Sequence, residues 1–443
     1  MYKPIVEEDK ETIKSLLKLY KKAYHIIALV VLVVGMGLIP FIGFFVGETT
    51  LNLNFTFVYI LFLFQCVSSY LVTYKRSILY AYQKNYIISI IESLYIVVLN
   101  VLQLMILQIT KNYYLYLAIK IIFALIENIV ISKIADTKFP FIKEKNVKNL
   151  NENIEKDIFE RIKATFLHKI GGVVIRGTDN IIISKFLGLG IVGIYSNYYM
   201  IILYVGEIIR QMISSLTPSV GNLLVEGNEE SILSVHKKIN FFNFWLATFS
   251  ATSILVIVQS FIKIWMGTEY LLSMWVVIVL VMNYYLTIMR STNDTFFSAA
   301  GIWIETKYVP LVESFMNIIF SLVLLKIFGL AGVFLGTLIS SMALWCYTYP
   351  KFIYKKILRK TYFEYIKENG IYLLIFIAIS GITYLASKIF VISNLWLDII
   401  IRVLICLIVP NFILLIIYRK SDEFEYFKNL IKYLLKTKLT KKT

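Results

Sequence analysis

The stretch "KIGGVVIRGTDN" (169–180) places charged side chains inside a long apolar segment of the chain. Lys169 and Arg176 are seven residues apart, so in a helix they lie on nearly the same face, and Asp179 lies about one turn further along. Asn180 adds an amide next to them. Charges within an apolar span are costly and mark functional sites, and an arginine can engage phosphate oxygens through two hydrogen bonds. These residue types therefore predict a site for a ligand that carries a diphosphate.

A structural interpretation of the same residues stays open. Arg176 and Asp179 would then pair within the helix and fix its packing, while Lys169 would extend to the membrane surface. The two interpretations differ in whether Arg176 faces a ligand or a neighbouring helix.

Other charged and aromatic residues favour structural roles. Glu207 and Arg210 are three residues apart near the end of an apolar segment, which predicts a local pair at the membrane surface. Asp398 and Arg402 are four apart, which predicts a structural pair. The aromatic run "YSNYYM" (195–200) is interpreted as a membrane-interface belt rather than as a sugar-stacking platform.

The elements that must position these residues are transmembrane helices. The chain has 443 residues, of which 58% are hydrophobic and 16% are charged, whereas soluble domains carry about 25% charged residues. Apolar runs recur at about 20 residues, the length that a helix needs to cross a bilayer. The sequence predicts an all-α membrane fold with about 12 spans. The predicted spans are 23–46, 55–74, 87–109, 113–135, 158–187, 190–213, 241–265, 272–290, 306–327, 330–349, 370–390 and 394–418.

The formal charge of +17 is distributed as a membrane protein requires. Most Lys and Arg residues fall in alternate loops and in the two tails, which is the positive-inside pattern. We expect a multi-pass membrane protein with both termini in the cytoplasm, no cleaved signal peptide and no nucleic-acid partner. The basic tail "KTKLTKKT" (436–443) is expected to meet anionic lipid headgroups.

The remaining reactive residue types do not form a site pattern. Cys66, Cys346 and Cys406 lie in apolar segments and have no His or Cys at metal-ligand spacing. The sequence also lacks a phosphate-binding glycine loop and a nucleophile–base pattern. We expect no cofactor, no metal and no enzymatic activity.

An internal repeat organises the chain. "VEEDKETIKSLLKLYKK" (6–22) aligns with "VEGNEESILSVHKKINF" (225–241), and "SIIESLYIVVLN" (89–100) aligns with "PLVESFMNIIFS" (310–321). Both copies of the first motif have acids at the start and bases near the end, as suits a helix dipole. The repeat predicts two pseudo-symmetric lobes, each containing the same amphipathic helix.

The repeat also sets the expected domain boundaries. We expect an incomplete N-terminal lobe at 1–135, a cytoplasmic linker at 136–157, a six-span C-terminal lobe at 158–350 and a terminal helix pair with its basic tail at 351–443. The first lobe is incomplete in this scheme because two spans that precede the second copy have no counterpart before the first. Glu92 and Glu313 occupy equivalent positions in the two copies, and we interpret them as packing residues rather than as cavity-lining ones.

The stretch "FLHKIGGVVIRGTDNIIISKFLGLGIVGIYSNYYMI" (166–201) resembles the start of the second lobe in Gram-positive members of the polysaccharide biosynthesis or O-antigen flippase family. This family belongs to the multidrug/oligosaccharidyl-lipid/polysaccharide flippase superfamily. The opening "MYKPIVEEDKETI" (1–13) resembles the loop between the second and third spans of the same proteins. The resemblance implies two lobes around a central cavity, alternating access, and a chain that lacks the first two of the usual spans.

The resemblance also implies a function. We expect the chain to translocate polyprenyl-pyrophosphate-linked oligosaccharide for capsule, exopolysaccharide or cell-wall glycan synthesis, in contact with membrane lipids and with a polysaccharide polymerase or glycosyltransferases. Arg176 and Lys169 would hold the pyrophosphate. The full set of predicted substrate-binding residues is Arg176, Lys169, Asp179, Asn180 and, from the first lobe, Lys120 and Glu127, which are seven residues apart.

Two alternatives to this function stay open. The first is a multidrug or cation antiporter of the same superfamily, whose cationic cargo would favour an acidic cavity. The second is a truncated remnant that folds but no longer transports. The reason for this hypothesis is the absent pair of spans.

Overall fold

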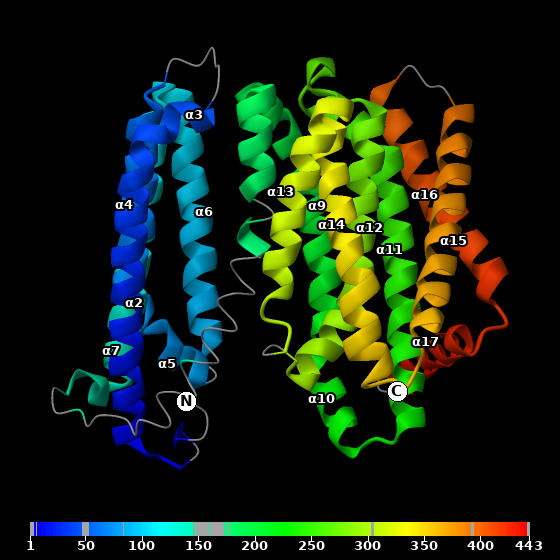
Figure 1. Ribbon diagram of the computed structural model, residues 1–443, viewed down its shortest axis with the longest axis horizontal. Coiled ribbons are helices and arrows are strands. Elements are labelled where there is room, and N and C mark those ends of the chain that lie inside the picture. The colour runs from blue at the N-terminus through cyan, green and yellow to red at the C-terminus, as the bar shows by residue number, and fades with distance from the viewer. Residues whose placement is uncertain are drawn as a thin grey trace. The chain divides into compact units, whose positions relative to one another are not determined.

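In a computed structural model of the chain, all regular structure in the described residues is helical (Figure 1). The structure describes residues 4–5, 7–46, 53–82, 84–144, 147, 159, 172–174, 177–302, 305–390 and 394–440. The chain divides into two compact units, Met1–Glu160 and Arg161–Thr443, which are described separately below as unit 1 and unit 2.

Among the described residues, 11 helices are long and apolar enough to cross a membrane. They cover every predicted span except 158–187. In that span, residues 172–174 and 177–187 are helical, and the rest lies outside the described residues. The chain is therefore a multi-pass membrane protein.

Unit 1 has few buried side chains. Its helices are α2 (Lys10–Leu38), α3 (Ile42–Val46), α4 (Phe55–Thr73), α5 (Arg76–Ala81), α6 (Asn85–Thr110) and α7 (Tyr113–Lys138). Ile13, Ile78, Ile88 and Ile131 form a small buried cluster, whereas α4 contains no buried residue. Long apolar helices with so little protein burial have the surfaces that lipid tails cover.

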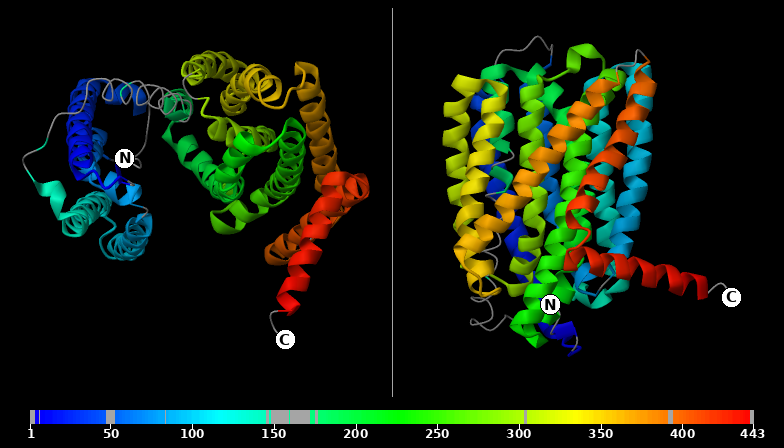
Figure 2. Two further views of the ribbon diagram at one scale, coloured as in Figure 1. Left: turned by 90° about the horizontal axis from the view of Figure 1, so that it is seen from below. Right: turned by 90° about the vertical axis from the view of Figure 1, so that its right-hand side faces the viewer.

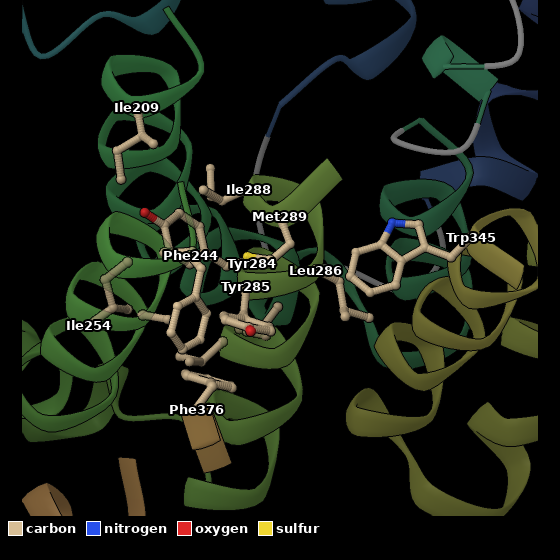
Figure 3. Close-up of a cluster of buried hydrophobic side chains, with 14 of the residues drawn as sticks. Ile209, Phe244, Ile254, Tyr284, Tyr285, Leu286, Ile288, Met289, Trp345 and Phe376 are labelled. Carbon is tan, nitrogen blue, oxygen red and sulfur yellow. The ribbon is translucent and has the colours of Figure 1, made fainter. Parts of the chain in front are cut away.

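Unit 2 has an extensive core around α11 and α12. Phe244 of α11, Tyr285 of α12 and Phe376 of α15 meet in this core (Figure 3). The rings of Tyr285 and Phe376 stack with centroids 3.9 Å apart, and Phe244 stacks on Tyr372 at 4.2 Å. The helices of unit 2, after the segment 177–187, are α9 (Leu189–Ser214), α10 (Thr217–Glu226), α11 (Glu229–Trp265), α12 (Met274–Ala300), α13 (Val309–Phe328), α14 (Leu330–Tyr349), α15 (Tyr362–Ile389), α16 (Leu395–Tyr418) and α17 (Asp422–Thr440).

Helices α13 and α14 approach each other at two glycines four residues apart. A Cβ atom on Gly332 would lie 2.0 Å from the carbonyl oxygen of Leu324, and one on Gly336 would lie 2.4 Å from the backbone nitrogen of Ser321. Small residues at this spacing let helix backbones come close in membranes. The two helices are therefore tightly packed against each other.

Helices α15 and α16 pack on α11 through polar contacts. Thr252 of α11 and Ser380 of α15 share a hydrogen bond of 2.8 Å. Ser260 of α11 donates to Asp398 of α16 at 2.7 Å, and Arg402 pairs with the same carboxylate at 2.7 Å. The predicted structural pair of Asp398 and Arg402 is therefore confirmed, and Ser260 links it to the core.

The internal repeat reappears in the helix caps. The Asp9 side chain accepts a hydrogen bond from the Thr12 backbone N–H at 3.0 Å before α2. The Asn228 side chain accepts one from the Ser231 N–H at 2.8 Å before α11. These pairs align with each other in the repeat of 6–22 and 225–241, so the repeat is a shared local structure as well as a sequence pattern.

Asp9→Ala and Asn228→Ala are each expected to destabilise the first turn of their helix by about 1 kcal/mol, because each removes a capping acceptor. Hydrogen exchange should speed up at the first amides of α2 or α11 and nowhere else. The matched controls are Asp9→Asn and Asn228→Asp, which keep the acceptor and should leave exchange unchanged. Equal exchange in the alanine and control variants would contradict the capping role.

Candidate functional site

A cavity of about 490 Å³ with both polar and apolar lining residues lies within unit 2. One wall is a face of α12, where Asn283, Thr287, Arg290 and Asp294 follow one another at helical spacing. The other walls come from the segment 177–187 and from α9, α13 and α14. The further lining residues are Gly172, Asp179, Asn180, Tyr195, Tyr199, Ile202, Leu203, Gly206, Arg210, Leu280, Tyr284, Ile288, Glu313, Phe334, Thr337 and Ser341.

Arg290 is the centre of a polar network at this cavity. Its Nε donates to the Tyr349 hydroxyl at 3.1 Å, and that hydroxyl donates to Asp294 at 2.5 Å. One terminal nitrogen lies 3.7 Å from Glu313, which also accepts from Ser341 at 3.0 Å. Each carboxylate therefore has a donor of its own. Since a guanidinium has five N–H groups, these contacts with described residues do not use all the donors of Arg290.

Arg210 supplies a second cation to the cavity wall from α9. Its Nη2 donates to Glu207 at 2.6 Å, so the predicted local pair of these residues is present. Its Nε is buried and has no hydrogen-bond partner among the residues that the structure describes. A buried donor without a partner is costly. Arg210 therefore lines the cavity in addition to its pair with Glu207.

A cluster of oxygen atoms lies around Asp179. This side chain is 7% exposed and accepts from Thr337 at 2.9 Å, while Asn317 donates to the same hydroxyl at 2.9 Å. Within the described part of the chain, Oδ1 of Asp179 and Oδ1 of Asn317 have no hydrogen-bond partner. Carboxylate and amide oxygens are the ligand types that hard cations prefer, and a buried carboxylate can also take up a proton.

No three His, Cys, Asp or Glu side chains come together as metal ligands within the described ranges. Among the described residues, the Asp179 cluster contains one acid, together with the Thr337 hydroxyl and the Asn317 amide.

Tyrosines of α9 provide aromatic surface. Tyr195 and Tyr199 line the cavity, and Tyr195 packs on Phe334 with centroids 4.6 Å apart. Tyr198 donates to Gln259 at 2.8 Å. Tyr195 and Tyr198 are 6% and 1% exposed. The prediction that 195–200 forms a membrane-interface belt is wrong for these two, because they turn into the core of unit 2.

The structure brings two of the predicted site residues into this cavity, Asp179 and Asn180. Lys169 and Arg176 lie outside the described residues. The alternative pairing of Arg176 with Asp179 is therefore not described either.

The two predicted site residues of unit 1, Lys120 and Glu127, have different partners. Glu127 accepts from Arg76 at 2.6 Å, whereas the Lys120 ammonium lies over the Phe62 ring, 5.4 Å from its centroid. Arg76 also pairs with Glu92.

Glu92 and Glu313 therefore share more than their position in the repeat. Each pairs with an arginine that precedes it in the chain, Arg76 in unit 1 and Arg290 in unit 2. The packing role expected of them takes the form of an ion pair with a neighbouring helix, and Glu313 in addition lines the cavity.

Sequence reasoning missed Arg290 and Asp294 because Arg290 was the last residue of the predicted span 272–290 and Asp294 lay beyond it. Helix α12 continues to Ala300, so both side chains lie well within the helix. The recurrence of polar residues at 283, 287, 290 and 294 is a helical period, and this signal would have identified the polar face of α12.

Comparisons with known proteins agree with this architecture. A family model described as "Polysaccharide biosynthesis protein" matches residues 4–223. A solved structure titled "Lipid II flippase MurJ, inward closed conformation" is similar with a TM-score of 0.65 and 14% sequence identity. The similarity covers 91% of this chain and 84% of that one. No curated protein sequence matches the chain. The structural likeness confirms the predicted all-α membrane fold.

Proposed function

Because the chain belongs to the polysaccharide biosynthesis protein family, we propose that it moves a polyprenyl-pyrophosphate-linked oligosaccharide across the bacterial plasma membrane. The similar solved structure is titled a lipid II flippase, which supports a lipid-linked glycan as the general class of cargo. The chain would act as a transporter rather than as an enzyme, and its product would feed polysaccharide synthesis.

The observation that carries this proposal is the presence of Arg210 and Arg290 in one cavity. A diphosphate offers several charged oxygens, and arginine is the residue best suited to bind them in pairs. Asn283 and Thr287 offer hydrogen bonds to sugar hydroxyls from the same wall. Tyr199 offers an aromatic surface.

The predicted residues outside this arrangement remain part of the proposal. Arg176 and Lys169 would add cations from the sequence segment just before Asp179. Lys120 and Glu127 remain predicted substrate-binding residues of unit 1. Alternating access would expose the cargo first to the cytoplasm and then to the outside, as in other transporters built from repeats. Both termini would be cytoplasmic, following the distribution of Lys and Arg.

A second candidate function rests on the acids of the same cavity. Asp179, Asp294 and Glu313 all line it, and carboxylates within a membrane bind cationic cargo or protons. Cation antiport of the multidrug type would use them directly, whereas the flippase function uses the arginines.

Arg210→Gln is expected to slow transport of a fluorescent polyprenyl-pyrophosphate-linked sugar in proteoliposomes by at least about tenfold. The reason is that a hydrogen bond to a charged group contributes about 1.5–3 kcal/mol. Arg359→Gln is the matched control, since Arg359 is 65% exposed, pairs with Glu229 on the surface and does not line the cavity.

The same vesicles separate the two functions. Movement of the labelled lipid that depends on Arg210 supports the flippase. Exchange of an organic cation for protons or Na⁺, with no movement of the lipid, would reject the flippase in favour of the antiporter.

A further inference from the structure

Helix α17 lies crosswise to the long helices of unit 2. It runs roughly perpendicular to them at one end of the bundle (Figure 2, right). It begins at Asp422, after a turn that follows the end of α16 at Tyr418. Since α16 is one of the membrane-spanning helices, this short connection keeps the start of α17 at the membrane surface.

One side of α17 is fixed to the bundle by aromatic contacts. Phe424 stacks on Trp245 with centroids 6.0 Å apart, and Phe427 stacks on Phe242 at 5.3 Å. The indole N–H of Trp245 donates to Asn411 of α16 at 2.8 Å. These contacts set the direction in which the helix leaves the bundle.

Another side of α17 exposes a stripe of large side chains. Tyr426, Leu430 and Tyr433 follow at helical spacing and are 44%, 38% and 66% exposed. Tyr426 also lies under the Lys238 ammonium at 4.4 Å. Tyrosine and leucine on a helix that lies in the membrane plane are typical of helices at the lipid–water interface.

The charge of α17 changes along its length. Acids at Asp422, Glu423 and Glu425 stand at its N-terminus, where they favour the helix dipole. From Lys428 to the end of the chain there are six lysines and no acid. Lys428 and Lys432 are exposed. The far half of the helix is therefore positively charged beside an apolar stripe.

We infer that α17 is an interfacial helix that binds anionic phospholipid headgroups. Its stripe of Tyr426, Leu430 and Tyr433 enters the boundary between headgroups and acyl chains, and the lysines pair with lipid phosphates. The short connection from α16 selects a lipid surface over a soluble partner, because it holds the helix where headgroups begin.

The test is hydrogen exchange of the full chain in nanodiscs of neutral lipid and in nanodiscs that contain anionic lipid. Amides of residues 424–433 are expected to exchange more slowly in the anionic discs. Lys428→Gln/Lys432→Gln should reduce that difference by about thirtyfold, since each basic residue near an anionic surface contributes about a fivefold factor.

The matched control is Lys326→Gln/Lys388→Gln, which removes the same charge from the ends of α13 and α15. It should leave exchange in α17 unchanged. Leu430→Glu should lose protection in both lipids, because it places a charge in the apolar stripe. Equal exchange of α17 in neutral and anionic discs, or an equal effect of the control, would overturn the inference.

Discussion

Arg290→Gln is expected to abolish transport and to destabilise unit 2, and adding Glu313→Gln is expected to restore the stability without restoring transport. Arg290 is the charged partner of Glu313, whose side chain is 6% exposed. Removing one partner of a buried pair costs about 3–5 kcal/mol, because the other charge stays buried and uncompensated. The second substitution removes that charge, so the protein should recover its fold while still lacking the cation.

Thermal unfolding in detergent and lipid transport in proteoliposomes measure the two effects separately. The single variant should lose both properties, and the double variant should differ from wild type in transport alone. A double variant that transports normally would show that Arg290 acts only through the structure and would remove it from the proposed site.

Glu313→Gln alone tests whether Glu313 competes with a diphosphate for Arg290. Glu313 is the resident counter-ion of Arg290 at 3.7 Å, so a diphosphate must compete with it. Removing the carboxylate charge should raise the affinity for inorganic pyrophosphate by about tenfold, because a unit charge at this distance acts with about 4 kcal/mol at an effective dielectric constant of about 20 and with less near solvent. Weaker pyrophosphate binding would contradict the competition.

The second large effect is expected at the glycines of α14. Gly332→Ala and Gly336→Ala should each destabilise unit 2 by about 3 kcal/mol, the upper end of the usual cost of overpacking. The added methyl group would meet the backbone of α13 at 2.0 and 2.4 Å, and a backbone cannot move aside as a side chain can. Gly381→Ala in α15 has open space around its Cβ and is the matched control. It should be neutral or slightly stabilising.

Size-exclusion profiles and melting temperatures of the three glycine variants check this expectation. If Gly332→Ala has the same melting temperature as the Gly381→Ala control, the close approach of α13 and α14 does not contribute to stability. The transport assay should follow stability here, since α13 and α14 carry Glu313, Thr337 and Ser341.

Much of the fold was predictable because it follows from local properties of the sequence. The length of the apolar runs predicted the described spans. The repeat of 6–22 and 225–241 predicted two equivalent helices, and their caps at Asp9 and Asn228 match. The Asp398–Arg402 pair was predictable for the same reason, since both members lie on one helix.

The site was predictable only in part because its partners lie far apart in sequence. A hydropathy pattern ends a span at a charge, yet α12 carries Arg290 and Asp294 within the helix, where Tyr349 contacts both. From the sequence, Tyr195 is likewise expected at the membrane interface. In the structure it packs against Phe334 instead. These contacts join residues that are far apart in the sequence. The spacing of residues along the chain therefore does not reveal them.

The close packing of α13 on α14 also has a thermodynamic consequence. Glu313 and Asn317 lie on α13, and Ser341 and Thr337 on α14, so this helix pair carries part of the Arg290 network and part of the Asp179 cluster. A displacement of the pair changes both sites together. If the two sites are occupied by an anion and a cation, each ligand must change the affinity for the other by the same factor. The close approach of α13 and α14 at the two glycines would then determine how strongly binding at one site changes the affinity of the other.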